Sequence, residues 1–75
     1  MASAAAELVE FIAKAIVSDK DAVKVREQDG DLLELETAQD DRGRVIGRQG
    51  RVAKAMRLVL AASRSGAECR LEIVD

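Results

Sequence analysis

The chain has 75 residues, of which 48% are apolar and 35% charged, and this composition predicts one globular domain near the smallest size that folds around a single core. One phenylalanine, one cysteine and no histidine exclude aromatic platforms for stacked bases, internal disulfides and the commonest zinc and general-base chemistry. We therefore expect a single domain over residues 1–75, without a cofactor or metal ion and without enzymatic activity.

Charge is segregated along the chain, although the net charge is only -2. Residues 1–41 carry 11 acidic and 4 basic side chains, and residues 65–75 carry 3 acidic and 1 basic. Residues 42–64 between them carry 7 basic side chains and no acidic one. All of the local positive potential therefore belongs to one block, where an anionic partner would be expected to bind.

Residues 3–17 are predicted to form an amphipathic helix that Ser3 caps at its N-terminus. The predicted core-facing stripe, with Val9 and Phe11 at its margins, consists of Leu8, Ile12, Ala15 and Ile16. The opposite side carries Glu7, Glu10 and Lys14. These charges make the segment too polar for a membrane span, and it lacks the basic start of a signal peptide. A cytoplasmic location is therefore expected.

Three short segments alternate between apolar and polar residues, as expected of strands with one buried face. The first two are residues 22–27 (AVKVRE) and 32–37 (LLELET), joined by a turn at Asp29–Gly30, where positive φ costs least. The third is residues 69–74 (CRLEIV). The predicted inward side chains are Val23, Val25, Leu33, Leu35, Cys69, Leu71 and Ile73. The outward ones suit cross-strand ion pairs and not an anion: Lys24, Arg26, Glu34, Glu36, Arg70 and Glu72.

Two helices are predicted between the second and third strands. The first begins at Asp40 or Asp41, both good capping residues, and ends after barely two turns at Gly47, which can adopt the left-handed conformation. The second runs over residues 50–64 and is terminated by Gly66. Its predicted core face consists of Val52, Ala55, Met56, Val59 and Leu60, and its outer arc of Arg51, Lys54, Arg57 and Arg64.

The resulting order is helix, strand, strand, helix, helix, strand. It predicts an α+β domain in which three helices cover one face of a three-stranded sheet. Asp40 and Asp41 could also be imagined as paired catalytic carboxylates. No base or nucleophile accompanies them in the sequence, so helix capping is the favoured role.

The segment GRVIGRQGR at residues 43–51 has three glycines and three arginines, a composition that a hydrophobic core does not use. Gly47 and Gly50 let the backbone turn sharply and leave the N–H groups of Arg48 and Gln49 open to an incoming group. Gly50 also begins a helix whose first N–H groups are unpaired and whose dipole attracts anions. The guanidinium groups around this point match phosphate oxygens, which predicts a sugar-phosphate ligand: Arg44, Arg48 and Arg51.

The glycine spacing fits neither the P-loop nor the dinucleotide-binding fingerprint, so a nucleotide-hydrolysing enzyme is not expected. The alternative for residues 47–50 is a plain turn between helices, with arginines that provide solubility. Basic helix surfaces also arise for solvation alone, so Arg44, Arg51 and Lys54 could include a residue without a ligand contact. Two further basic residues could pair with the acidic N-terminal segment instead: Arg57 and Arg64.

The residues VIGRQG within a β-α-α-β core resemble the KH domain, whose Gly-x-x-Gly loop holds about four nucleotides of single-stranded nucleic acid. The additional helix and strand before this core resemble the type II, prokaryotic form. LVEFIAKAIV, AVKVRE, DDRGRVIGRQGRVAKAMR and LEIVD are together similar to the small stand-alone bacterial RNA-binding proteins of the KhpA family. The resemblance covers nearly the whole chain and departs at Lys20, where members often have proline.

This resemblance implies a protein that binds single-stranded RNA and serves RNA chaperoning or post-transcriptional regulation, with links to cell shape and division. It also implies pairing with a second copy or with a KhpB/Jag-like protein. By analogy with KH domains, Ile46 would lie beneath a base, whereas Val52 is expected to pack in the core. The expected RNA-binding residues are Gly47, Arg48, Gln49, Gly50, Arg44, Arg51, Lys54 and Ile46. The rival interpretation is a protein-interaction module whose loop does not meet RNA.

Overall fold

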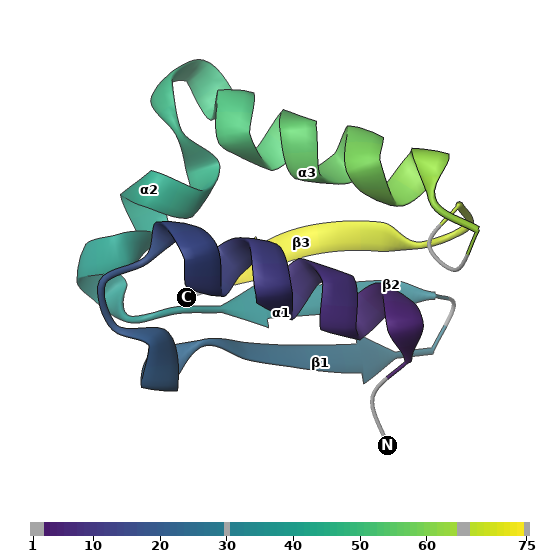
Figure 1. Cartoon of the computed structure of the whole chain (residues 1–75), viewed down its shortest axis with the longest axis horizontal. Helices are drawn as coiled ribbons and strands as arrows, with labels where there is room; N and C mark the ends of the chain where they lie inside the picture. Colours follow the sequence, from purple (N-terminus) through teal and green to yellow (C-terminus); the bar gives the residue numbers. More distant parts are fainter. Residues whose placement is uncertain (1–2, 30, 65–66, 75) are drawn as a thin grey trace.

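The computed structural model describes residues 3–29, 31–64 and 67–74. Its helices and strands follow one another in the predicted order, helix, strand, strand, helix, helix, strand (Figure 1). They are α1 (Ala4–Ile16), β1 (Lys24–Gln28), β2 (Leu32–Glu36), α2 (Arg42–Ile46), α3 (Arg51–Ala62) and β3 (Arg70–Val74). Short stretches of 3-10 helix connect them: η1 (Lys20–Ala22), η2 (Gln39–Asp41) and η3 (Arg48–Gly50).

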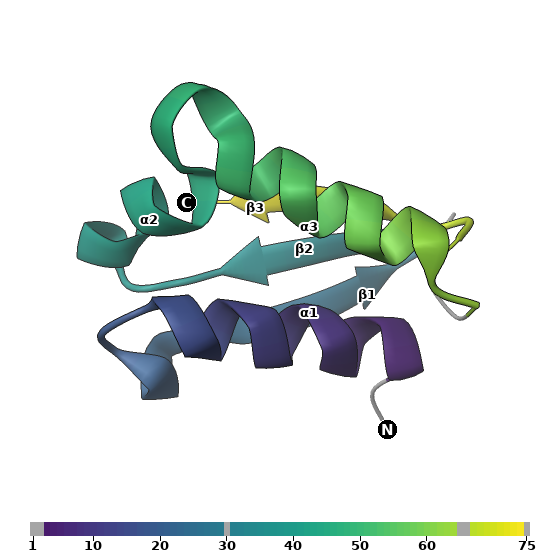
Figure 2. The same ribbon diagram turned by 45° about the horizontal axis from the view of Figure 1, so that its top comes forward.

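The central strand of the sheet is β2, which runs antiparallel to β1 and parallel to β3. In this register Leu35 lies opposite Val25 of β1 and Ile73 of β3, so the inward side chains of the three strands are aligned. All three α-helices lie on the same face of the sheet (Figure 2). The predicted α+β class and its one-sided helical layer are therefore confirmed.

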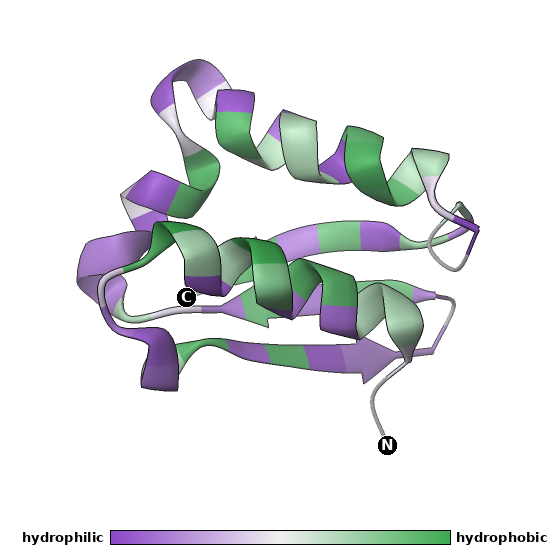
Figure 3. Ribbon diagram, viewed as in Figure 1, coloured by the Kyte–Doolittle hydropathy of each residue, from purple (hydrophilic) through white to green (hydrophobic). Residues whose placement is uncertain are grey.

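The core lies between the sheet and the helices, and the alternation predicted for the strands is confirmed. Leu33, Leu35 and Leu71 are buried, and Val25 and Ile73 pack against them. Figure 3 shows the same alternation as apolar and polar bands along the strands. Because the inward residues of a strand repeat every second position, the sheet presents one continuous apolar face to the helices.

The outer face of the sheet is polar, and neighbouring strands pair their side chains across it. Arg26 Nη2 of β1 lies 2.9 Å from Glu36 Oε1 of β2. Gln28 Nε2 donates a hydrogen bond of 2.9 Å to Glu34 Oε1. The predicted suitability of this face for cross-strand ion pairs is confirmed.

The N-terminal cap of α1 is as predicted, but its core-facing side is not. The hydroxyl oxygen of Ser3 accepts a hydrogen bond from the N–H of Ala6 at 3.1 Å. The predicted core residue Ala15 is exposed, and Phe11 exposes 75% of its surface. The buried side instead consists of Ala5, Ala6, Val9 and Ala13, with Leu8 and Ile12 partly covered. The larger apolar residues dominated the predicted stripe, whereas the small alanines let the helix approach the sheet.

The core-facing side of α3 is rotated in a similar way. Met56 and Leu60 are buried as predicted, and Ala53 joins them. The predicted core residues Ala55 and Val59 are exposed, Val59 by 45%. The helix carries more apolar residues than one sheet face can cover, so periodicity alone could not select among them.

The two predicted turn glycines Gly30 and Gly66 lie outside the described residues. Beside the first of them, Asp31 has a φ of 60°. The last helix ends at Ala62 rather than Arg64. Within residues 3–29, 31–64 and 67–74, no helix combines the length and the apolarity needed to cross a membrane.

Candidate nucleic-acid interface

The loop of residues 47–50 joins α2 to α3 and stands at the edge of the molecule (Figure 1). Three of its four residues have positive φ: 79° at Gly47, 58° at Gln49 and 74° at Gly50. Gly47 pairs its φ with a ψ of 168°, a combination that is essentially restricted to glycine, whereas left-handed helical geometry had been expected there. Gln49 adopts left-handed geometry despite its side chain, with a ψ of 25°. Backbone strain of this kind is concentrated at functional sites.

Gly47 and Gly50 are required for different reasons. A Cβ atom on Gly47 would lie 2.5 Å from Val52 Cγ2 and 2.8 Å from the backbone nitrogen of Val52. A Cβ atom on Gly50 would meet no atom within 4 Å. Gly47 is therefore needed both for its conformation and for its close contact with α3, while Gly50 is needed only for its positive φ.

Two backbone N–H groups of the loop have no hydrogen-bond partner among the described residues. The N–H of Gly47 bonds to Gly43 O at 2.8 Å, and that of Gly50 bonds to Gly47 O at 3.0 Å. The N–H of Arg51 bonds to Arg48 O. No such bond is made by the N–H groups of Arg48 and Gln49. They lie at the N-terminus of α3, where no side chain caps the helix, so an anion finds donors and a favourable dipole there.

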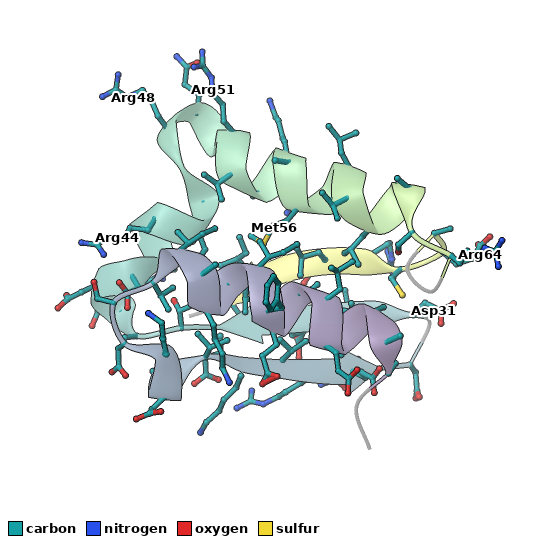
Figure 4. The ribbon with its side chains drawn as sticks, in the orientation of Figure 1. Asp31, Arg44, Arg48, Arg51, Met56 and Arg64 are labelled. Atoms are coloured by element: carbon teal, nitrogen blue, oxygen red, sulfur yellow. The ribbon has the colours of Figure 1, made fainter. Side chains whose placement is uncertain are left out.

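Basic side chains extend from the same point. Arg48 and Arg51 project outward from the connection between α2 and α3 (Figure 4). Arg51 Nη2 donates to Gln49 Oε1 at 3.4 Å, and Lys54 is exposed one turn further along α3. Ile46, the last residue of α2, exposes 38% of its surface beside them. The structure thus brings together all of the predicted site residues except one.

The exception is Arg44, which lies apart from Arg48 and Arg51 (Figure 4). Arg44 Nη1 donates to the hydroxyl oxygen of Ser18 and lies 3.8 Å from Asp41 Oδ1. These contacts direct Arg44 toward the segment that follows α1. A contact between Arg44 and RNA stays a prediction.

The predicted capping role of Asp41 is wrong. Asp41 precedes α2, but its side chain makes no capping hydrogen bond there. It is buried, and its carboxylate accepts hydrogen bonds from Ser18 N at 3.1 Å and Asp19 N at 3.0 Å. These bonds, that of Asp19 first, lower the pKa of Asp41 below its usual value. Sequence reasoning missed this contact because its partners are 22 and 23 residues away.

Arg57 also has a partner that sequence reasoning did not find. Its Nε donates to the backbone oxygen of Leu71 in β3 at 3.2 Å, and not to the acidic N-terminal segment.

A hollow of about 400 Å³ lies between α3 and β3 beside this hydrogen bond. It is lined by Arg57, Cys69, Arg70, Leu71 and Glu72. Burial is the main cause of a raised pKa for the Cys69 thiol, which keeps this group protonated and poorly reactive.

A second hollow lies between α1 and α3 and is apolar. It has a volume of about 370 Å³, and its lining includes Ile12, Ile16, Val52, Ala55 and Val59. The same two helices also carry exposed apolar side chains outside the lining of the hollow. They include Phe11 and Leu58.

Comparison with known proteins gives one consistent result. Residues 6–73 match the family model described as "KhpA/KhpB, KH domain". The chain is 42% identical over 74 residues to the RNA-binding protein KhpA of Borreliella burgdorferi, which covers 92% of this chain and 90% of that protein. It is 47% identical over 73 residues to the RNA-binding protein KhpA of Halalkalibacterium halodurans, which covers 91% and 96%. No solved structure gives a significant match.

Proposed function

The chain belongs to the KhpA/KhpB family of KH domains, and on that premise we propose that it binds single-stranded RNA through residues 47–50 without catalysing a reaction. The observation that carries this proposal is the pair of unbonded N–H groups at Arg48 and Gln49. They lie at the start of a 12-residue helix and are surrounded by exposed basic side chains. Relatives over nearly the full length are named RNA-binding proteins, which supports RNA as the ligand.

The proposed mode of binding separates phosphates from bases. Phosphate oxygens accept hydrogen bonds from the free loop amides. They also form ion pairs with the side chains of Arg48, Arg51 and Lys54. Bases lie against apolar side chains such as Ile46, with little stacking energy because the only aromatic ring, that of Phe11, belongs to α1. Contacts to the backbone carry little sequence information, so low sequence preference is expected.

The test is a double substitution, Arg48→Asp with Gln49→Asp, measured by binding to a labelled single-stranded RNA. Affinity is expected to fall by roughly tenfold or more, because carboxylates would then face phosphates. Circular dichroism should show an unchanged fold, since both side chains are exposed. Arg48→Asp alone has a charge-matched control in Lys24→Asp on the outer face of the sheet. Equal affinity in the double variant and the unmodified chain would exclude the loop as the binding site.

Modest affinity from a single module suits brief contacts with many transcripts. We further propose that the protein acts in the cytoplasm as an RNA chaperone or post-transcriptional regulator. The support for this role is the binding mode itself, which depends on the sugar-phosphate backbone and not on base sequence.

A second candidate function is supported by the apolar surface of α1 and α3. Val59 is exposed at the apolar hollow between these helices, and Phe11 of α1 and Leu58 of α3 are also exposed. Exposed apolar side chains that form a contiguous patch are a mark of protein association. In this alternative, the chain forms a homodimer or joins a KhpB/Jag-like partner and binds little RNA itself. Such a complex would survive the Arg48→Asp/Gln49→Asp substitution, whereas RNA binding through the loop, as in the first proposal, would not.

A further inference from the structure

Asp41 is the one charged side chain that is buried among the described residues, with 3% of its surface exposed. Each of its carboxylate oxygens accepts a hydrogen bond from a backbone N–H, that of Ser18 at 3.1 Å and that of Asp19 at 3.0 Å. A buried carboxylate is tolerated only when it is paired in this way. The contact joins the residue before α2 to the segment that directly follows α1.

Arg44 completes this contact from within α2. Its Nη1 atom lies 3.8 Å from Asp41 Oδ1 and donates a hydrogen bond to the hydroxyl oxygen of Ser18. Ser18 is therefore held twice, through its N–H by Asp41 and through its hydroxyl by Arg44. We call Asp41, Arg44, Ser18 and Asp19 together the α1–α2 contact.

The α1–α2 contact matters because α2 cannot hold itself in place. The helix has five residues, and helices of that length are not stable alone. Its position depends on Val45, which is fully buried in the core, and on the α1–α2 contact at its start. The residue after α2 is Gly47, the first of the loop. A shift of α2 relative to α1 would therefore move the loop as well.

We propose that Asp41 is a positioning residue for RNA binding, which holds the loop of residues 47–50 in its binding arrangement by fixing α2 to the end of α1. This inference rests on the proposed RNA-binding function of that loop. Asp41 does not touch RNA, because its side chain is buried and faces Ser18 and Asp19. Without the Asp41 carboxylate, the loop adopts its binding arrangement for only part of the time. The apparent affinity then falls to that fraction of its full value.

Aspartate fits this position better than its neutral counterpart. Two consecutive N–H groups require two acceptors, and a carboxylate supplies both. Asparagine has nearly the same shape but offers one oxygen and one NH₂ group, which cannot accept from the second N–H. Asp41→Asn therefore removes one hydrogen bond and the attraction to Arg44 while leaving the packing unchanged.

The experiment compares Asp41→Asn with Val25→Ala, a control that weakens the core from β1 and leaves the α1–α2 contact intact. Affinity for a labelled single-stranded RNA is measured at pH 7, in conditions where both variants are folded. Asp41→Asn is expected to bind about threefold to tenfold more weakly, as for a loop that is competent about a third to a tenth of the time. Val25→Ala is expected to bind like the unmodified chain even where it unfolds more easily. Equal affinity of all three proteins would overturn the proposal.

Nuclear magnetic resonance separates an effect on loop position from a general loss of stability. The backbone amide resonances of Gly47 and Gly50 should shift or broaden in Asp41→Asn and stay in place in Val25→Ala. Unchanged glycine signals in Asp41→Asn would contradict the proposal. If Asp41→Asn does not fold, Ser18→Ala serves instead, because it removes only the acceptor of Arg44 at an exposed position. It should move the same two signals, and their constancy would count against the α1–α2 contact.

Failure of the proposed function would look different. If Arg48→Asp/Gln49→Asp binds RNA like the unmodified chain, the loop is not the site and the proposed function falls. If that variant loses binding while Asp41→Asn keeps both its affinity and its glycine signals, only the role of Asp41 is refuted.

Discussion

Gly47 and Val52 pack so closely that a Cβ atom on the glycine would overlap the valine side chain and approach its backbone nitrogen. Val52 also lines the apolar hollow between α1 and α3. One valine thus contacts the loop on one side and the apolar surface on the other. The first residue of the loop, Gly47, is therefore held by this contact with α3, and it directly follows α2, whose position depends on Asp41.

Alanine substitutions of Gly47 and Gly50 should differ in their effect. Gly47→Ala is expected to cost about 1–3 kcal/mol in the free energy of unfolding from its backbone conformation alone, with the overlap at Val52 in addition. Gly50→Ala meets open space and should cost only about 1–2 kcal/mol for its left-handed conformation. Urea unfolding of both variants measures the difference. Val52→Ala should restore part of the loss in Gly47→Ala, because one overlapping atom group is removed.

RNA affinity should depend on salt in proportion to the phosphates contacted. Neutralising about three to four phosphates predicts a slope of roughly -2 to -3 in a plot of log affinity against log salt concentration. The measurement is a fluorescence titration at several salt concentrations. If the Lys54 side chain faces RNA, replacing it by Gln should remove about one phosphate contact. The slope should then become shallower by the amount that one such contact contributes. A slope near zero would contradict binding through phosphates.

Acid should remove the stabilisation that Asp41 provides. Its pKa lies below the ordinary value of 3.8 because the N–H groups of Asp19 and Ser18 donate to the carboxylate. The carboxylate of Asp41 therefore binds a proton more readily in the unfolded chain than in the folded chain. The contribution of Asp41 is fully present above the ordinary pKa and is lost as the pH falls through the lower folded pKa. Urea unfolding across acidic pH should show the stability gap between the unmodified chain and Asp41→Asn closing in this window. A gap that stays constant would be evidence against the role of the carboxylate.

Arg57 should stabilise the position of β3 relative to α3. Arg57→Met keeps the apolar stem but removes the hydrogen bond to the backbone oxygen of Leu71. We expect a loss of about 0.5–1.5 kcal/mol in the free energy of unfolding, the usual value for one such bond. Arg64→Met, at an exposed position in the connection between α3 and β3, is the control and should change stability little. Equal losses in both variants would mean that the hydrogen bond contributes nothing specific.

The apolar surface of α1 and α3 should determine the state of association. Phe11→Ser and Val59→Ser place polar groups on this surface at exposed positions, so the fold should be retained. If the chain forms a dimer, both substitutions should shift its sedimentation toward the monomer. Leu8→Ala, which alters a partly buried residue of the same helix, gives a comparison for changes in packing. A dimer that persists in the Phe11→Ser/Val59→Ser double variant would assign association to another face.

The strands were predictable because their burial follows a strict period of two. Leu33, Leu35 and Leu71 were assigned correctly from alternation alone. The helices were harder, because α1 buries small alanines such as Ala13 while Phe11 remains exposed. A hydropathy pattern weights residues by how apolar they are, and it does not register that a small side chain permits a close approach.

At the candidate site, too, the sequence revealed features formed by neighbouring residues but not contacts between residues that are far apart in the chain. The glycines at 47 and 50 and the arginines near them are local features, and the sequence identified them. The contacts of Asp41 with Ser18 and of Arg57 with Leu71 join residues 23 and 14 positions apart. Nothing in the spacing of these residues indicates a bond, because the fold alone brings them together. Sequence patterns therefore identified the loop but not the residues that hold it.

The bond from Arg57 to β3 has a consequence for the chain in concentrated solution. β3 is an outer strand of the sheet, and such strands expose backbone groups onto which another extended chain can add, which leads to aggregation. Proline often blocks this addition, and the sequence contains none. Here the guanidinium group of Arg57 in α3 already donates a hydrogen bond to the backbone oxygen of Leu71, one of the acceptors that an added strand would need. Removing Arg57 would thus be expected to lower the concentration at which the folded protein remains in solution.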